Sequence, residues 1–127
     1  MRKEETLRGR GSFASVLESG ERIEGELLRC FFSVDRGAGT RVRAGFSVSR
    51  KVGGAVTRNR VKRLMRAAFD AERDRLRASP GSSALTIVFV YKGRKDIQAG
   101  RLRLTRLQGD MTLLCRRCAS SMSTMTT

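Results

Sequence analysis

The chain has 127 residues, which is enough for one domain with a modest core and too few for two. Its 27 Lys and Arg residues outweigh 12 Asp and Glu residues, so the formal charge is +15 and a polyanion is the expected partner. The sequence has no long apolar run and no apolar leader segment, which excludes a membrane span and a secretory signal and predicts a cytoplasmic protein. Histidine is absent, so the usual general base, triad member and metal ligand are missing together.

The first predicted element is a short helix over residues 12–20. Ser12 is a suitable cap, Phe13 and Leu17 follow at helical spacing, and Gly20 ends the segment. A strand is predicted next, over residues 27–34, because apolar and other residues alternate there. One of its faces is unusual, since it places Phe31 beside Arg29.

A second strand is predicted over residues 41–51, with an apolar face and a face of small and cationic residues. The apolar face contains Val42, Ala44, Phe46 and Val48. A flexible turn, VGGAVT, then leads into a long helix from about Ala55 to Ala78.

This long helix has two different faces. The apolar stripe consists of Val61, Leu64, Met65, Ala68, Phe69 and Leu76. The opposite side consists of Asn59, Lys62, Arg63, Arg66, Arg73 and Arg77. We expect the first face to pack on a sheet and the second to bind an anion.

The rest of the chain predicts one more strand, one more helix and a tail. Residues 84–91 form a continuous apolar run, which predicts a strand buried on both faces and paired in parallel through a β-α-β unit. A helix from about Gln98 to Cys118 follows, with Leu104, Leu107 and Met111 on one stripe. We expect one domain over residues 1–118 and a disordered tail over 119–127, which has little to bury.

Enzyme and metal motifs are weak in this chain, and no catalytic or metal-ligating residue is predicted. The carboxylates alternate with arginines at helical spacings, which fits surface ion pairs better than an acid/base dyad. Cys115 and Cys118 have the spacing of a zinc or redox motif, but only Cys30 remains to complete it, and packed helix thiols are the alternative. KVGGAV could offer amides to a phosphate, yet it lacks the full nucleotide-binding pattern and also fits a plain turn.

The basic helix and the Phe31 face favour nucleic acid over a merely solvated charged surface. Lys62, Arg63 and Arg66 would repel one another unless phosphates neutralised them. Phe13 and Phe31 could stack on unpaired bases, or they could cover each other as a minor core. Exposed aromatic rings suit single-stranded RNA better than duplex DNA, and the chain lacks a helix-turn-helix, so no DNA partner is expected.

From Arg43 to Phe69 the chain, RAGFSVSRKVGGAVTRNRVKRLMRAAF, resembles the signature of the bacterial ribonuclease P protein subunit. The flanks LRGRGSFASVLESGER and LTIVFVYKGRK resemble the family more loosely. The resemblance implies an α+β fold, an α-β-β-β-α-β-β-α sandwich like domain 2 of ribosomal protein S5, with a left-handed β-α-β crossover. The residue pattern alone predicts three helices and three strands, so the resemblance supplies an additional strand, placed within residues 94–104.

The resemblance also implies function. The family's protein assists a separate catalytic RNA, which removes the 5′ leader of precursor tRNA with magnesium held by that RNA, and the protein itself binds no cofactor. The residues implied to bind the catalytic RNA are Arg58, Asn59, Arg60, Lys62, Arg63 and Arg66. The residues implied to bind the leader are Phe13, Leu17, Phe31, Ser47, Ser49, Arg50, Lys51 and Lys92.

Leu17 and Lys92 depart from the aromatic residue and the arginine that the family often carries at these places, which weakens stacking and bidentate pairing there. The alternative function is that of a ribosomal or general single-stranded RNA-binding protein without processing activity.

Overall fold

The computed structural model describes residues 20–36, 41–78, 83–94 and 97–125. Four strands form one mixed sheet in the order β1-β2-β4-β3. They are β1 (Glu21–Glu24), β2 (Leu28–Arg36), β3 (Arg41–Val48) and β4 (Ser83–Tyr91). β1 and β4 each pair antiparallel with β2, while β3 pairs in parallel with β4, which confirms the predicted β-α-β unit.

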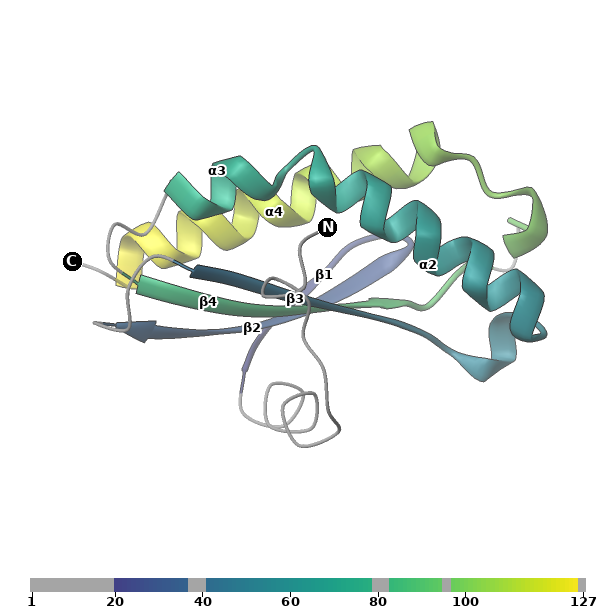
Figure 1. The fold of residues 1–127 in the computed structure, drawn as a ribbon, viewed down its shortest axis with the longest axis horizontal. Helices are drawn as coiled ribbons and strands as arrows, with labels where there is room; N and C mark the ends of the chain where they lie inside the picture. Colours follow the sequence, from purple (N-terminus) through teal and green to yellow (C-terminus); the bar gives the residue numbers. More distant parts are fainter. Residues whose placement is uncertain (1–19, 37–40, 79–82, 95–96, 126–127) are drawn as a thin grey trace.

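The helices of the described residues lie on one face of this sheet (Figure 1). They are α2 (Ala55–Asp70), α3 (Arg73–Ala78) and α4 (Leu104–Met125). Two short 3-10 turns, η2 (Arg50–Val52) and η3 (Ala99–Arg101), precede α2 and α4. None of the described helices is long and apolar enough to cross a membrane.

The core fills the space between the sheet and the helices, and it confirms the predicted apolar faces. Phe46 of β3, Phe69 of α2 and Phe89 of β4 form a cluster with ring centroids 5.4 to 6.0 Å apart. Val61 and Met65 are fully buried on the same helix face, and Leu64 packs at its edge. Burial of these side chains orients α2, because only one of its faces can meet the sheet.

The predicted long helix over residues 55–78 is wrong in one respect, since it breaks into α2 and α3 at residues 71–72. The N–H of Glu72 donates to the carbonyl of Phe69 at 2.8 Å, a tighter turn than an α-helix makes. No glycine or proline occurs at the break. The packing of α3 against α4 and β3, which buries Leu76, accompanies the change of direction.

Two predictions for the later part of the chain are also wrong. No strand occurs among the described residues 94 and 97–104, which contribute an isolated bridge between Arg94 and Ile97 and the turn η3. The strand that the residue pattern did not predict is β1, earlier in the chain. The last helix begins at Leu104, which is 40% exposed, and continues to Met125. The helix therefore continues through residues 119–125, beyond its predicted end at Cys118, and Cys118 and Ala119 pack on the core.

The predicted first helix, with Phe13 and Leu17, lies outside the described residues.

Candidate nucleic-acid interface

The outward face of α2 carries four cations and one amide side chain, which together we call the cationic ridge. It consists of Arg58, Asn59, Lys62, Arg63 and Arg66. Asn59, Arg63 and Arg66 are exposed, and the other two are half-buried. Within the described part of the chain no carboxylate pairs with any of them. Repulsion along the ridge is therefore offset only by solvent ions or by an anionic partner.

Arg58 adds a more specific signal on this ridge. Its Nε is buried and has no hydrogen-bond partner among the described residues. A buried donor without an acceptor costs free energy, so such a group favours a ligand that brings an acceptor. A phosphate oxygen would satisfy it, because guanidinium groups pair well with phosphate.

Arg60, predicted to contact RNA with the ridge, has another role in the fold. Its two terminal nitrogens donate to the carbonyls of Ala99 at 3.2 Å and Leu102 at 2.7 Å. The guanidinium therefore attaches α2 to η3, on the flank of the helix between the ridge and the core. Sequence spacing predicts on which side of the helix Arg60 lies, but it does not predict which carbonyls lie close to its guanidinium.

The face of the sheet opposite the described helices carries Phe31 in a cross-strand row. Phe31 of β2 is in register with Arg22 of β1 and Val88 of β4, and Val88 is in register with Gly45 of β3. The Phe31 ring is half-buried and packs against Val88, as does Val90. Phe13 and Leu17 cannot be placed beside it, because they lie outside the described residues.

The polar residues predicted to contact the leader gather where β3 ends. Ser47 lies in register with Val90 on the same face as Phe31. Arg50 and Lys51 are exposed in η2. The hydroxyl of Ser49 accepts the N–H of Lys51 at 3.3 Å, so this side chain also caps the turn.

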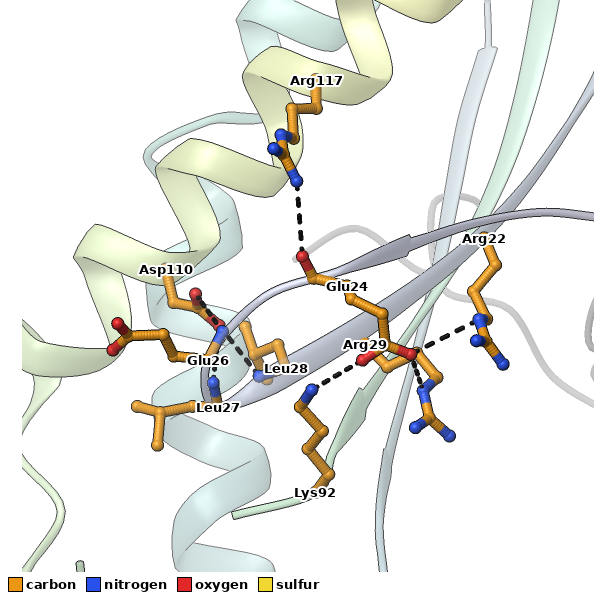
Figure 2. A network of polar contacts seen from close by, with 9 residues as sticks. All are labelled: Arg22, Glu24, Glu26, Leu27, Leu28, Arg29, Lys92, Asp110 and Arg117. Carbon is orange, nitrogen blue, oxygen red and sulfur yellow. Dashed lines mark hydrogen bonds and ion pairs between the residues drawn. The ribbon is translucent and has the colours of Figure 1, made fainter. Parts of the chain in front are cut away.

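Lys92, the remaining predicted leader residue, belongs to an acid-centred network next to that face (Figure 2). Its Nζ lies 2.6 Å from Glu24 Oε2, and the other Glu24 oxygen accepts from Arg29 and lies 3.4 Å from Arg22. The hydrogen bond from Lys92, supported by Arg29, holds the pKa of Glu24 below its usual value against the opposing effect of burial. The sequence predicts such ion pairs in general but not that Lys92, 68 residues away, joins them.

A buried carboxylate fixes the β1–β2 turn beside this network, and the sequence does not predict it. Asp110 of α4 accepts the backbone N–H groups of Glu26, Leu27 and Leu28 at 2.8 to 3.1 Å (Figure 2). Any Cβ at Gly25 would come within 2.6 Å of the Asp110 oxygens, so the turn requires glycine there. The Asp110 carboxylate thus supplies the hydrogen-bond acceptors that these backbone amides would otherwise lack.

The three cysteines are buried and form no disulfide with one another. Burial raises the pKa of Cys118 to about 12 and raises that of Cys30 well above its usual value, with Cys118 and Cys115 adding to the latter shift. Cys30 and Cys118 are therefore packed thiols and not reactive ones, because their thiolate form is disfavoured. No group of three or more His, Cys, Asp or Glu residues suited to a metal occurs among the residues that the structure describes.

Comparison with known proteins gives one consistent family. Residues 1–119 match the family described as Ribonuclease P. The ribonuclease P protein component of Desulfovibrio desulfuricans is 34% identical over 113 residues, covering 89% of this chain and 82% of that protein. That of Dictyoglomus thermophilum is 41% identical over 101 residues, covering 80% and 81%. A 40% identical match to the component of Desulfatibacillum aliphaticivorans covers 60% of this chain and 63% of that protein.

Solved structures agree with the fold. The ribonuclease P protein of Staphylococcus aureus superposes with a TM-score of 0.66 at 18% identity, covering 91% of this chain and 96% of that one. The protein of Thermotoga maritima superposes with a TM-score of 0.65 at 24% identity, covering 89% and 96%. At these identities the likeness establishes the shared α+β architecture.

Proposed function

Because the chain belongs to the bacterial ribonuclease P protein component family, we propose that its cationic ridge binds the catalytic RNA and that the Phe31 face of its sheet binds the leader of precursor tRNA. Membership makes the chain a subunit of a ribonucleoprotein endoribonuclease that acts in tRNA processing. The observation that carries the proposal is the ridge itself, a row of outward cations without carboxylate partners in the described part of the fold.

The ridge suits a structured RNA because its spacing is rigid. Burial of Val61, Met65 and Phe69 fixes the rotation of α2, so the side chains of Arg63 and Arg66 are presented together. Binding to phosphates releases counterions, which makes the affinity strongly dependent on salt. In this proposal Arg58, Asn59, Lys62, Arg63 and Arg66 contact the RNA, and Arg60 supports them by holding η3.

The leader is proposed to lie across the sheet. Phe31 offers a ring on which an unpaired base can stack, which is worth roughly 1–3 kcal/mol per base and tolerates any sequence. Ser47, Ser49, Arg50, Lys51 and Lys92 are proposed as contacts to its backbone. Phe13 and Leu17 are proposed to complete this site from the first helix.

The protein's part in the reaction is proposed to be positioning and charge compensation. Two RNA molecules repel each other, and the +15 chain offsets that repulsion while it holds the leader extended. The described side chains do not fit a resident metal site, since no suitable group of three or more ligands occurs among them. We propose that magnesium is held by the RNA subunit and that this chain supplies no catalytic residue.

Two finer expectations accompany this proposal, and one alternative opposes it. The β3–α2–β4 crossover is proposed to have the left-handed sense of the family, which is rare among parallel units. The partners are proposed to be the catalytic RNA and precursor tRNA in the cytoplasm, with neither DNA nor a membrane. The alternative, a general single-stranded RNA-binding protein without processing activity, would bind RNA without accelerating leader removal.

Reconstitution tests the proposal. Purified protein, a bacterial ribonuclease P RNA and labelled precursor tRNA are combined at low magnesium, with each component alone as a control. We expect leader removal to accelerate only when the protein and the catalytic RNA are both present. RNA binding without acceleration would favour the alternative, and cleavage by the protein alone would contradict the assignment of catalysis to the RNA.

The leader contact needs a separate measurement. Phe31→Ala should weaken binding of precursor tRNA to the reconstituted complex by about 5-fold or more, and should leave mature tRNA binding unchanged. Phe31→Tyr keeps the ring and serves as the control. An equal loss for precursor and mature tRNA would refute a leader-specific role of Phe31.

A further inference from the structure

A hollow with a volume of about 680 Å³ opens beside the beginning of α2. No residue of the cationic ridge or of the Phe31 row lines it, and it shares Lys51 and Lys92 with the proposed leader contacts. Its walls come from η2, from the first turn of α2, and from the chain that follows β4 as far as η3. These segments lie together at one end of the molecule (Figure 1). The volume falls within the range of about 300–1,000 Å³ that is typical of small-ligand sites.

The topology favours a ligand at this place. β3 and β4 run in parallel, so their carboxyl ends, Val48 and Tyr91, lie at the same edge of the sheet. The chain leaves β3 through η2 and enters α2 at this edge. In sheets built from β-α-β units, ligands bind outside the carboxyl ends of the strands, next to the beginning of a helix.

Tyr91 gives the hollow a polar group that the fold does not use. The residue is fully buried and lines the hollow, and its hydroxyl has no hydrogen-bond partner in the described part of the chain. Leaving a buried hydroxyl unsatisfied costs free energy that a ligand donor or acceptor would recover. Gly93 lies against the ring in a left-handed conformation with φ of 73°, and a Cβ there would be 3.4 Å from Tyr91 Cε1.

The remaining walls combine apolar surface with one uncompensated cation. Val52 and Ile97 are half-buried in the walls. Lys51 is exposed and has no carboxylate partner among the described residues, whereas Lys92 and Arg94 at the rim are bonded to Glu24 and Glu26.

The first turn of α2 adds positive character at the same place. Thr57 of this turn lines the hollow. The helix begins at Gly54 without a side-chain cap, and its first turn contains no acidic residue. Its first N–H groups therefore remain available to an anion.

We propose that this hollow binds one unpaired nucleotide of RNA, with its base against Tyr91 and its phosphate at Lys51 and the beginning of α2. A flat base with several donors and acceptors suits an enclosed hydroxyl between apolar walls, and the phosphate suits the free lysine and the uncapped helix. The inference rests on the proposed function only in taking RNA as the source of the nucleotide. The site would fix one base of the RNA relative to the cationic ridge.

The test uses the full chain, labelled with nitrogen-15, and mononucleotides as probes. We expect uridine and adenosine 5′-monophosphates to shift the amide signals of Thr57, Gly93 and Gly100, and ribose 5-phosphate to bind several-fold more weakly. Equal binding of ribose 5-phosphate would show a phosphate site without a base pocket and would overturn the proposal. Unshifted Gly93 and Gly100 signals would overturn it as well.

Two variants distinguish the contribution of the Tyr91 hydroxyl to nucleotide affinity from that of the Lys51 charge. Tyr91→Phe should lower nucleotide affinity about 3- to 5-fold, which corresponds to one hydrogen bond, while its melting temperature stays equal or rises because an unsatisfied group is removed. Lys51→Gln, at an exposed position, should weaken the nucleotides and ribose 5-phosphate alike. Unchanged nucleotide affinity in Tyr91→Phe would overturn the role of the hydroxyl.

A ridge variant keeps this test independent of the proposed function. Arg63→Ala with Arg66→Ala should leave mononucleotide binding unchanged, since neither residue lines the hollow. Loss of mononucleotide binding in this variant would assign the binding to the ridge and overturn the pocket. If the wild-type protein fails to stimulate leader removal yet binds mononucleotides at Gly93, the proposed function fails and the pocket stands.

Discussion

The β1–β2 hairpin and helix α2 both carry arginine and lysine side chains, but these side chains have different partners in the two regions. Around the hairpin, Glu24 and Glu26 each bond to two or more cations drawn from β1, β2, α4 and the chain after β4. On α2 the only acidic residue is Asp70 at the end of the helix, and it pairs with Arg73. A cation that already has a carboxylate contributes to the fold, whereas a row of cations without one stores repulsion that an RNA can relieve. The position of the acids, and not the number of arginines, distinguishes the two regions.

The largest expected effect is on the hairpin side. Asp110→Ala should lower the free energy of unfolding by about 3–5 kcal/mol, because the buried N–H groups of Leu27 and Leu28 and the partly buried N–H of Glu26 lose their acceptor. Denaturant unfolding measures the change. Asp70→Ala removes an exposed carboxylate and should change stability by no more than about 0.5 kcal/mol. Equal losses for the two variants would show that Asp110 has no special role in the turn.

The comparison of the two regions is tested most directly by removing equal charge from each. Arg63→Ala with Arg66→Ala should weaken binding to the catalytic RNA on the order of 10-fold and reduce the slope of log affinity against log salt by about 1 to 2. Arg94→Ala with Arg106→Ala removes the same charge from cations that pair with Glu26. This control should change affinity by less than about threefold. If both variants behave alike, net charge and not the unpaired ridge governs binding.

Substitution of Arg60 tests whether a cation on helix α2 can stabilise the fold and not bind RNA. Arg60→Ala should lower the free energy of unfolding by about 1–3 kcal/mol, since the carbonyls of Ala99 and Leu102 lose their donors. The salt dependence of RNA binding should stay as in the wild type. Arg63→Ala should show the reverse pattern, with stability within about 0.5 kcal/mol and the salt slope reduced by about 0.7–0.9. A reduced slope in Arg60→Ala would place this residue on the RNA.

The smallest expected effect comes from releasing paired cations. Glu24→Gln frees Arg29 and Lys92 beside the Phe31 face and should raise leader affinity about two- to threefold at low salt. The folded pKa of Glu24 is below its ordinary value of 4.5, so its stabilising effect is present above that pH and is lost as pH falls through the lower folded value. Glu24→Gln should therefore unfold with less pH dependence in that acidic range. Unchanged leader affinity would show that these cations do not contact the leader.

Much of the fold could be predicted from periodicity. The alternation of Val42, Ala44, Phe46 and Val48 predicted the buried face of β3, and the stripe of Val61, Met65 and Phe69 predicted the buried face of α2. The strand β1 was missed because ERIE is short and strongly charged, and it forms through its pairing with β2. The break at residues 71–72 was missed because packing, and no local breaker, accompanies it.

The candidate site was predictable to a lesser extent. Spacing on a helix identified the outward direction of Asn59, Arg63 and Arg66, because direction follows from periodicity alone. Spacing could not distinguish Arg60, whose partners lie 39 and 42 residues away. Sequence spacing also could not identify Glu24 as the partner of Lys92, because the two residues are 68 positions apart.

The sequence by itself determined the strong positive charge, the two faces of α2 and the motif that resembles the ribonuclease P protein family, because these depend on composition and local order. Only the tertiary structure decided which cations are paired, that Asp110 holds a turn 84 residues away at Glu26, and that a hollow adjoins the buried Tyr91 hydroxyl. The physical reason is that local periodicity fixes the direction of a side chain, whereas the partner it meets depends on how distant segments pack.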